Sequence, residues 1–364
     1  MKKQRQIYFF LPNFSTGGAG NSIFNICKSI NRANRSLNVI SIGKNHYKKK
    51  FKDIGVRVIE LKNKRTITGV IKIFFMLNNI SKNKEIIFIS NINYANVLST
   101  IFLKNINNLK LILIERTPFQ ELEFYSNYLE FFKKKIIFYL AKVFYKKADY
   151  VIGNSLNVSK YIELKINTKV LTIYPIIKTK IIKKKNYNKI VNISWIGRDS
   201  EEKKLTDFLK SINFLKDKKI QINIVTNNNI KTKVENIVSK DILKKIKLYK
   251  FNQNKKFLNK IYSKTDIYVN TSMYEGFPNT IVEAIFFECL VITSNSHGGC
   301  RELIRNSKYG LLYKPHDYNQ LYKTIKYAVE NFNSCKSKIK IAKRNLIKIA
   351  NQNNNNYKKF FDNI

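Results

Sequence analysis

The stretch Ser272-Met-Tyr-Glu-Gly-Phe-Pro-Asn-Thr-Ile-Val-Glu-Ala284 determines both the fold and the site that we predict. It follows a short apolar run, Asp266-Ile-Tyr-Val-Asn270, and leads through a polar loop into a helix that Pro278 opens. The order strand, loop, helix is typical of parallel sheets, in which ligands bind beyond the carboxyl ends of the strands. The loop carries Glu275 and the helix carries Glu283, so both carboxylates are predicted at that edge.

Two carboxylates near the free backbone N–H groups of a helix start suit a ligand with many hydroxyl groups and a phosphate, such as a nucleotide sugar. Spacing alone leaves a plainer interpretation open. Glu275 and Glu283 would then be surface residues near a helix start, where acidic side chains are common for electrostatic reasons. Patterns elsewhere in the chain decide between the two interpretations.

The same stretch resembles the signature of the retaining glycosyltransferases conventionally numbered family four. In that signature, Glu, seven residues and Glu follow Ser-x-x and precede Ala. The matching residues here are Ser272, Glu275, Gly276, Phe277, Pro278, Asn279, Glu283 and Ala284. The resemblance implies the GT-B fold, an α/β architecture of two Rossmann-like domains that face each other across a cleft, with parallel sheets covered by helices.

Further segments resemble the same family pattern, in the right order along nearly the whole chain. They are 7–12 with Gly17-Gly18-Ala19, 114–116, 148–155, 195–203, Gly298-Gly299 with Glu302, and 309–311. Glycines in such loops let backbone N–H groups approach a ligand closely. The resemblance therefore adds Gly17, Gly18, Gly299 and Glu302 to the expected substrate-binding residues, with Gly276, Phe277, Pro278, Asn279 and Glu283.

The resemblance also implies that Gly197, Arg198 and Lys203 grip the diphosphate of the donor. An arginine fork and a lysine point charge would stabilise the negative charge that develops on a leaving diphosphate. Glu283 is expected to bind the ribose hydroxyls, and Glu275 with the backbone that follows it the sugar. We expect Glu275, Arg198 and Lys203 to be the catalytic residues.

This chain departs from the family pattern in two places. Many relatives carry a glycine-rich turn where this chain has Val225-Thr-Asn-Asn-Asn-Ile230, in which asparagine can still adopt a left-handed turn. Many relatives also place a histidine near the reacting sugar, and His46 is the sole histidine of the first half. The resemblance implies that the departing diphosphate itself helps to take the acceptor proton, and a helper base stays unassigned.

Short strand-like runs alternate with longer segments of helical spacing, which predicts parallel sheets covered by helices. The strand-like runs are 38–43, 56–61, 85–90, 109–114, 190–196, 221–225, 246–249, 266–269 and 290–293. We expect an amino-terminal acceptor domain at 1–180, a charged linker at 178–189 and a carboxyl-terminal nucleotide-sugar donor domain at 189–342. In the family the last helix crosses back, so 343–364 are expected to pack on the first domain.

The chain of 364 residues has a formal charge of +44, which attracts any polyanion. Lysine, asparagine and isoleucine share adenine- and thymine-rich codons, so genome composition is one source of this charge. The partners to consider are an anionic substrate, a membrane surface and nucleic acid. No zinc-ligand spacing and no aromatic RNA-binding signature occurs, which makes a basic nucleic-acid-binding protein the minor alternative. A sugar-nucleotide epimerase has the same architecture, but its families lack the Glu-Gly-Phe-Pro-Asn segment.

Residues 128–147 combine large aromatic side chains with lysines at helical spacing, as interfacial helices do. Lysines interrupt the run, and no segment reaches the roughly 18 apolar residues that a bilayer span needs. The alternative is a core helix of the first domain with a basic outer face. On the interfacial interpretation the acceptor is carried on a lipid, and Lys133, Lys134 and Lys135 contact anionic lipid.

The apolar run at the amino terminus is too short for a signal peptide, so we expect a cytoplasmic protein, or a peripheral one on the inner face of the cell membrane. Cys27, Cys289, Cys300 and Cys335 show no Cys-x-x-Cys pairing, which is consistent with reduced thiols. We expect Cys300 to be a buried structural thiol.

No Asp-x-Asp occurs in the chain. Glycosyltransferases of the other major fold use that motif to hold a divalent metal, so we expect metal-independent transfer without a cofactor. By analogy, the segment Glu275-Gly-Phe-Pro-Asn279 indicates an enzyme of surface polysaccharide biosynthesis, such as lipopolysaccharide or capsule, that uses a UDP-hexose or UDP-N-acetylhexosamine.

Overall fold

The structure is a computed structural model, and it describes residues 5–14, 18–31, 35–125, 127–178, 190–251, 255–296 and 298–364. The chain divides into two compact units. The first contains Met1–Ile176 and Gln352–Ile364, and the second contains Ile177–Asn351. Most of the predicted linker, residues 179–189, lies outside the described residues.

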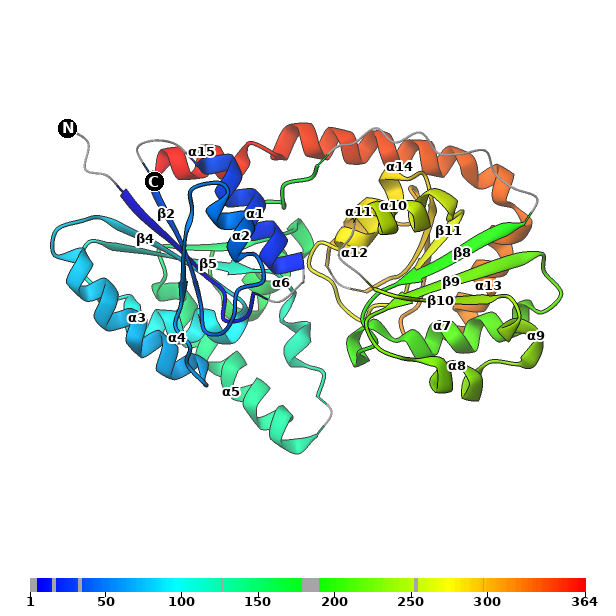
Figure 1. Ribbon diagram of the computed structural model, residues 1–364, viewed down its shortest axis with the longest axis horizontal. Coiled ribbons are helices and arrows are strands. Elements are labelled where there is room, and N and C mark those ends of the chain that lie inside the picture. The colour runs from blue at the N-terminus through cyan, green and yellow to red at the C-terminus, as the bar shows by residue number, and fades with distance from the viewer. Residues whose placement is uncertain are drawn as a thin grey trace. The chain divides into compact units, whose positions relative to one another are not determined.

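The first unit is built around a sheet of seven parallel strands in the order β3-β2-β1-β4-β5-β6-β7 (Figure 1). The strands are β1 (Arg5–Phe10), β2 (Arg35–Ser41), β3 (Arg57–Glu60), β4 (Ile86–Asn91), β5 (Leu109–Glu115), β6 (Tyr150–Gly153) and β7 (Leu171–Thr172). The helices are α1 (Gly18–Ile30), α2 (Lys48–Lys52), α3 (Thr66–Ser81), α4 (Asn93–Leu103), α5 (Tyr128–Phe144), α6 (Leu156–Ile166) and α15 (Asn356–Asn363), with the 3-10 helices η1 (Phe119–Leu122) and η2 (Tyr145–Lys147). The strand order reverses between β1 and β4, and such switch points are where open parallel sheets bind ligands.

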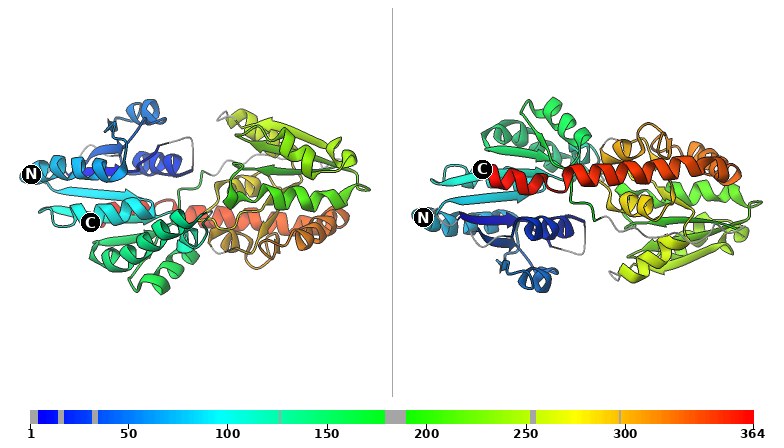
Figure 2. Two further views of the ribbon diagram at one scale, coloured as in Figure 1. Left: turned by 90° about the horizontal axis from the view of Figure 1, so that it is seen from below. Right: turned by 90° about the horizontal axis from the view of Figure 1, so that it is seen from above.

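Both faces of this sheet are buried, which explains why its strands are nearly continuous apolar runs. In β1, Tyr8 and Phe10 pack in one core with α3, α4 and α5. Ile7 and Phe9 point the other way and pack in a second core with α1 and α2. Figure 2 shows α1 and α2, in blue, on one side of the sheet and α5 and α6, in green, on the other.

The last helix, α15, completes the second of these cores. Tyr357 and Phe361 are each 1% exposed and pack there. Arg35 at the start of β2 fixes the helix end, because its Nη2 donates to the carbonyl oxygen of Phe361 at 2.8 Å and to Asp362 Oδ1 at 2.6 Å. The end of the chain is therefore part of the folded first unit.

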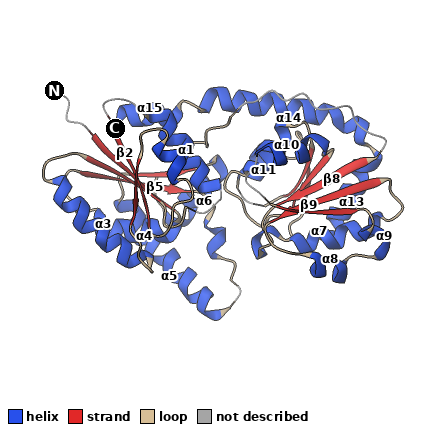
Figure 3. Ribbon diagram, viewed as in Figure 1, coloured by secondary structure: helices blue, strands red, loops and turns tan. Residues whose placement is uncertain are grey.

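The second unit is built around six parallel strands in the order β10-β9-β8-β11-β12-β13 (Figure 3). The strands are β8 (Val191–Ile196), β9 (Ile220–Thr226), β10 (Ile246–Lys250), β11 (Ile267–Asn270), β12 (Leu290–Ser294) and β13 (Leu311–Tyr313). The helices are α7 (Leu205–Ile212), α8 (Lys231–Ile237), α9 (Lys240–Leu243), α10 (Lys255–Lys264), α11 (Asn279–Phe286), α12 (Gly299–Ile304), α13 (Tyr318–Glu330) and α14 (Phe332–Asn353), with η3 (Glu201–Lys203) and η4 (Asn213–Leu215).

The core of the second unit lies where β8, β9 and β11 pack against α7, α8 and α13. Trp195, Ile224 and Val269 supply the strand side of this core, and Phe208 and Ile325 supply the helix side. The predicted fold class, two α/β units with parallel sheets covered by helices, is confirmed. The short strands β7 and β13 were not predicted, because two or three residues are too few for a recognisable run.

A carboxyl group, that of Glu115, lies inside the first unit. Glu115, at the end of β5, is 0% exposed, and its Oε1 accepts hydrogen bonds from Tyr145 Oη and, at 2.7 Å, from Asn96 Nδ2. Burial raises the pKa of Glu115 to about 8, and the two hydrogen bonds oppose part of the rise. The folded chain therefore holds this proton more tightly than the unfolded chain, where the pKa is near 4.5.

We expect Glu115→Gln to flatten the dependence of stability on pH. Between pH 4.5 and about 8 the folded chain binds more protons at this site than the unfolded chain, so the free energy of unfolding falls as pH rises, by at most about 1.4 kcal/mol per pH unit. The glutamine variant lacks this slope. Chemical unfolding at pH 5 and pH 8 measures it, with Glu201→Gln, whose side chain is 88% exposed, as the control. Equal slopes for Glu115→Gln and the unmutated chain would contradict this account.

Candidate functional site

The first predicted segment is the loop that follows β8. Gly197 N–H donates to the carbonyl oxygen of Val225 at 3.1 Å and so continues the sheet. Arg198 then points to solvent, with 69% of its side chain exposed, and its Nη2 donates to Glu202 Oε1 at 2.9 Å. Lys203 ends η3, and its side chain is 20% exposed. The loop therefore presents one exposed and one partly buried cation.

Lys203 and Glu275 meet in an ion pair. Lys203 Nζ donates to Glu275 Oε1, and Ser272 Oγ donates to the same oxygen at 2.8 Å. Because the two charged side chains are only 20% and 14% exposed, solvent screens this pair less than a surface pair. We refer to Lys203, Ser272 and Glu275 as the Lys–Glu cluster. The structure thus brings together two of the three predicted catalytic residues, and Arg198 lies in the same loop as Lys203.

Polar contacts fasten the loop after β8 to the loop after β11. Trp195 Nε1 donates to Thr271 Oγ1 at 2.9 Å, and Thr271 Oγ1 donates to the carbonyl oxygen of Lys203 at 2.6 Å. Met273 N–H donates to the carbonyl oxygen of Glu202 at 2.8 Å. The position of the cluster therefore rests on backbone contacts and does not depend on the long lysine side chain alone.

A third loop, after β12, packs against the backbone beside Glu275. Gly298 forms an isolated parallel bridge with Glu275, and Gly299 N–H donates to the carbonyl oxygen of Gly276 at 2.7 Å. Gly298 has a φ of +112°, and a Cβ there would overlap the carbonyl oxygen of Glu275. A Cβ on Gly299 would crowd the Gly276 carbonyl and Phe277. Both glycines are therefore required by close packing of the loop that carries Glu275.

The predicted residues of the following helix divide between solvent and core. Pro278 occupies the N-cap, and α11 begins one residue later than predicted, at Asn279. Asn279 and Glu283 are exposed, whereas Phe277 is buried. Under the helix, burial raises the pKa of Tyr262 well above its ordinary value, and the neighbouring Glu283 carboxylate raises it further. Glu283 is therefore an exposed carboxylate that interacts with the buried hydroxyl group of Tyr262.

The remaining predicted residues are dispersed. Glu302 lies half-buried in the first turn of α12. Gly18 is exposed at the first position of α1 in the first unit. Gly17 lies outside the described residues, as does His297. In the segment that replaces the glycine-rich turn, Asn227, Asn228 and Asn229 all have negative φ, so the left-handed turn that asparagine permits is not used.

Three residues that hold the site together were not predicted to belong to it: Trp195, Thr271 and Glu202. Thr271 directly follows β11 and Trp195 lies one residue before the end of β8, so their positions at the carboxyl edge were a usable signal. Glu202 could have been found from its spacing of four residues from Arg198.

The predicted structural thiol, Cys300, lies inside the second unit. Cys300 is 0% exposed, and burial raises the pKa of its thiol to about 12, as expected of a structural thiol. Within the described part of the chain, no group of three or more His, Cys, Asp and Glu side chains is arranged to hold a metal ion.

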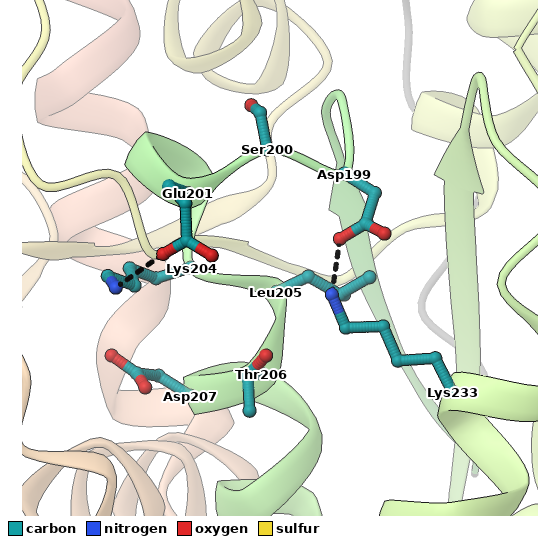
Figure 4. A pocket seen from close by; sticks show the side chains of 8 residues that line it. All are labelled: Asp199, Ser200, Glu201, Lys204, Leu205, Thr206, Asp207 and Lys233. Atoms are coloured by element: carbon teal, nitrogen blue, oxygen red, sulfur yellow. Dashed lines mark hydrogen bonds and ion pairs between the residues drawn. The ribbon is translucent and has the colours of Figure 1, made fainter. Parts of the chain in front are cut away.

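A polar pocket of about 440 Å³ lies beside η3 and the start of α7 (Figure 4). It is lined by Asp199, Ser200, Glu201, Lys204, Leu205, Thr206, Asp207 and Lys233. Both lysines are engaged there, Lys233 with Asp199 at 2.6 Å and Lys204 with Glu201 at 3.1 Å. The pocket contains none of the predicted site residues, and its charges largely pair with one another.

The Lys–Glu cluster lies beyond the carboxyl ends of β8 and β11, where α11 also begins. A lysine charge and the backbone N–H groups of a helix start both favour a phosphate. The Glu275 carboxylate and the Ser272 hydroxyl can accept hydrogen bonds from sugar hydroxyls. This edge of the second sheet is therefore chemically suited to a ligand that carries both groups.

We expect Gly298→Ala to destabilise the chain by at least about 2 kcal/mol, since the new methyl group requires both a strained φ and displacement of the Glu275 carbonyl. The free energy of unfolding from chemical denaturation measures this. Gly43→Ala is the control, because a Cβ at Gly43 meets open space. If both variants were equally stable, the packing role of Gly298 would be wrong.

Known sequences resemble parts or most of this chain. Residues 176–345 match the family described as glycosyl transferases group 1. An uncharacterized glycosyltransferase of Methanocaldococcus jannaschii is 29% identical over 251 residues, which cover 60% of this chain and 59% of that protein. A Campylobacter jejuni alpha-1,4-N-acetyl-D-galactosaminyltransferase, named for a PP-undecaprenol-linked GalNAc acceptor, is 26% identical over 357 residues and 93% of each chain.

Solved structures share the architecture at low sequence identity. Anabaena HepE in complex with UDP and glucose superposes with a TM-score of 0.76 at 15% identity, covering 100% of both chains. Sucrose-phosphate synthase from Thermosynechococcus elongatus superposes with a TM-score of 0.79 at 14% identity, covering 99% of this chain and 100% of the other. The chain therefore has the GT-B glycosyltransferase fold, and its second unit carries the sequence pattern of the group 1 glycosyl transferases.

Proposed function

We propose that the chain transfers a sugar from a nucleotide-diphosphate sugar to a glycan acceptor, with retention of configuration at the anomeric carbon. The observation that carries this proposal is the Lys–Glu cluster beside the start of α11. The family match over residues 176–345 supports a transferase, and the neighbour in complex with UDP and glucose supports a UDP-linked donor. The Campylobacter relative supports an N-acetylhexosamine as the transferred sugar.

We assign the donor diphosphate to Lys203 and Arg198. Each of these cations has a glutamate partner, Glu275 for Lys203 and Glu202 for Arg198. A diphosphate that binds the two cations would replace these partners, because it carries more charge than a carboxylate and accepts bidentate hydrogen bonds from arginine. The exchange releases Glu275 to accept hydrogen bonds from the sugar hydroxyls. Glu283, exposed on α11, would bind the ribose.

In the proposed reaction, the bond between the anomeric carbon and the diphosphate oxygen breaks, and a bond to the acceptor oxygen forms on the same face of the sugar. The acceptor hydroxyl gives its proton to the departing diphosphate. Lys203 and Arg198 stabilise the charge that develops on that group. This sequence needs no histidine as base, and it agrees with the exposed loop position of His46.

The donor assignment predicts that one of the UDP-, GDP-, ADP- or TDP-sugars stabilises the chain against heat, without added metal. Lys203→Gln and Glu283→Ala should each weaken its binding at least tenfold, as expected for loss of a charge-assisted hydrogen bond worth about 1.5–3 kcal/mol. Calorimetry measures the affinity. Lys218→Gln is the matched control, because Lys218 pairs with Glu330 at 2.6 Å on the surface of the same unit.

Equal donor affinity in Lys203→Gln and Lys218→Gln would show that the Lys–Glu cluster is not the diphosphate site. Conversion of the bound sugar nucleotide to an isomer without an acceptor would instead favour an epimerase. Transfer to a glycan acceptor, lost in Lys203→Gln, is the result that we expect.

The first unit exposes an apolar face on helix α5, and this face is relevant to the kind of acceptor that we propose. Along α5, five large side chains are exposed: Tyr128 83%, Leu129 73%, Phe132 60%, Ile136 58% and Tyr139 67%. At 3.6 residues per turn they fall within about 100° of the helix circumference. The opposite face of α5 packs on the first core through the buried Ala141 and the partly buried Ile137, Phe138 and Leu140, so the helix joins the core on one side and is exposed on the other.

Lysines flank this apolar face. Lys133 borders one side, and Lys135 and Lys142 border the other; all three are exposed. Lys134 is different, because its Nζ donates to the carbonyl oxygen of Phe124 and pairs with Glu130 at 2.9 Å. An apolar strip between cations suits the boundary between the acyl chains and anionic headgroups of a bilayer. None of the described helices has the length and apolar character that a membrane span requires.

We propose that α5 lies on an anionic membrane surface and that the acceptor glycan is carried on a lipid there. The relatives named for PP-undecaprenol glycans support a lipid-linked acceptor. Lys133, Lys135 and Lys142 would contact the headgroups, and Phe132, with the other exposed side chains of α5, the acyl boundary.

Reversal of charge at Lys133, Lys135 and Lys142 should weaken binding to phosphatidylglycerol vesicles at least tenfold, since each lysine near such a surface contributes about 1 kcal/mol. Vesicle co-sedimentation measures the affinity. The control reverses Lys231, Lys240 and Lys244, exposed lysines of the second unit, and so changes the net charge equally. If the two triple variants bound alike, attraction would come from net charge and the role of α5 would be wrong.

A further inference from the structure

The carboxyl edge of the first sheet carries a polar cluster that the proposed donor site does not use. Asn91 ends β4, Glu115 ends β5 with Arg116 directly after it, and Asn154 follows β6. We call these four residues the edge cluster. Asn91 also reaches β1, because its Nδ2 donates to the carbonyl oxygen of Phe10 at 3.0 Å. The edge cluster therefore lies at the switch point between β1 and β4.

Arg116 is held in this cluster by a neutral partner. Its Nε and Nη2 both donate to Asn91 Oδ1, at 3.1 and 2.7 Å, and its carbonyl oxygen accepts from Asn154 Nδ2 at 2.8 Å. Among the described residues, no carboxylate forms an ion pair with Arg116. The guanidinium is thus fixed in orientation, while its positive charge is not neutralised by a hydrogen-bonded anion.

The adjacent Glu115 supplies only part of that countercharge near neutral pH. Its pKa is raised to about 8 by burial, so the carboxyl group is mostly protonated at pH 7. Burial likewise lowers the pKa of Arg116, which reflects the cost of a cation in this environment. The C-terminal helix adds the Tyr357 hydroxyl, which interacts electrostatically with the guanidinium. Arg116 is only partly exposed and has no hydrogen-bonded carboxylate, so an anionic ligand would supply a favourable partner for its charge.

Two further features accompany the cluster. Buried oxygens without a hydrogen-bond partner occur there: Glu115 Oε2, Asn154 Oδ1 and Asn96 Oδ1. Ile92, between Asn91 and α4, has a φ of 81° and a ψ of 136°, a conformation that a β-branched residue rarely adopts. The two asparagine oxygens are acceptors, whereas Glu115 Oε2 can donate to an anion when the carboxyl group is protonated. Backbone strain such as that at Ile92 is more typical of ligand sites than of structural cores.

We infer that Arg116 is the centre of a phosphate-binding subsite at the carboxyl edge of the first sheet, and that its ligand is a diphosphate group. The guanidinium fork matches phosphate oxygens in geometry and charge. Asn91 positions the fork. α1 also starts from the loop after β1 at this edge, and its first backbone N–H groups favour an anion.

The choice of a diphosphate rests on the proposed transferase function, whereas the anion site itself does not. Two substrates of that reaction contain a diphosphate: the nucleotide-sugar donor and an acceptor carried on a polyprenyl diphosphate. Direct binding measurements separate these sources from each other, and they do not require the chain to be active in transfer.

The test measures binding of inorganic pyrophosphate to the full chain by calorimetry, in a background of Arg198→Gln and Lys203→Gln that disables the proposed donor site. We expect pyrophosphate to bind this background, and Arg116→Gln to weaken that binding at least tenfold. Arg57→Gln, which removes an exposed arginine from β3 of the same sheet, should leave it unchanged. Equal binding by the Arg116 and Arg57 variants would overturn the proposal.

A second pair of variants retains Arg116, so the proposal can still be tested if Arg116→Gln does not fold. Asn91→Asp puts a carboxylate against the guanidinium, whereas Asn91→Ala removes the contacts with Arg116 and Phe10 without adding charge. We expect pyrophosphate to bind Asn91→Asp at least fivefold more weakly than Asn91→Ala. Equal affinities would mean that Arg116 does not bind the anion.

Farnesyl diphosphate and UDP identify the source of the diphosphate in the chain with its donor site intact. Loss of farnesyl diphosphate affinity in Arg116→Gln, with UDP affinity unchanged, assigns the subsite to a lipid acceptor, and the reverse assigns it to the donor. Binding of glucuronate at Arg116 without binding of pyrophosphate would refute a phosphate site in favour of a carboxylate site. If UDP-sugars failed to bind at all while pyrophosphate bound at Arg116, the proposed function would be wrong and the anion site would stand.

Discussion

All strands of each sheet run parallel, and this constraint determines where polar side chains can meet. Carboxyl ends of parallel strands share an edge, so residues far apart in sequence become neighbours there. In the second unit, the loops after β8, β11 and β12 supply Lys203, Glu275 and Gly298. In the first, the ends of β4 and β5 supply Asn91 and Arg116. The hydrophobic cores thus serve to align two sets of loops.

The two edges hold their partly exposed cations differently, and the difference follows from the cost of desolvating charge. Lys203 is neutralised by Glu275, and the supporting Ser272 hydroxyl satisfies the same carboxylate oxygen. Arg116 has an amide as partner, beside a Glu115 that burial keeps largely protonated. A paired cation must exchange one anion for another when a ligand binds, whereas an unneutralised cation gains its first. Anion binding at the carboxyl edge of the second sheet therefore depends more on displacing a carboxylate of the protein itself.

The sequence predicted the parallel sheets, because apolar runs bounded by polar loops depend on local composition. It also predicted Lys203 and Glu275 as neighbours in one site, through a known motif, but not their direct ion pair, since the two residues are 72 positions apart. Local spacing could have revealed Arg198 with Glu202. The positive φ of Gly298 depends on tertiary packing, which no single segment encodes. The spacing along residues 128–147 indicated an amphipathic helix, but which of its faces is exposed also depends on packing.

The hydrogen bond between Trp195 and Thr271 links an indole ring to the loop that carries Lys203. Trp195 is the single tryptophan of the sequence and is 2% exposed, and Thr271 in turn contacts the carbonyl oxygen of Lys203. Indole emission shifts with the hydrogen bonding and polarity around the ring. The protein therefore contains its own optical reporter, and a change in fluorescence would record movement of the Lys203 loop in solution, in real time and without any attached dye.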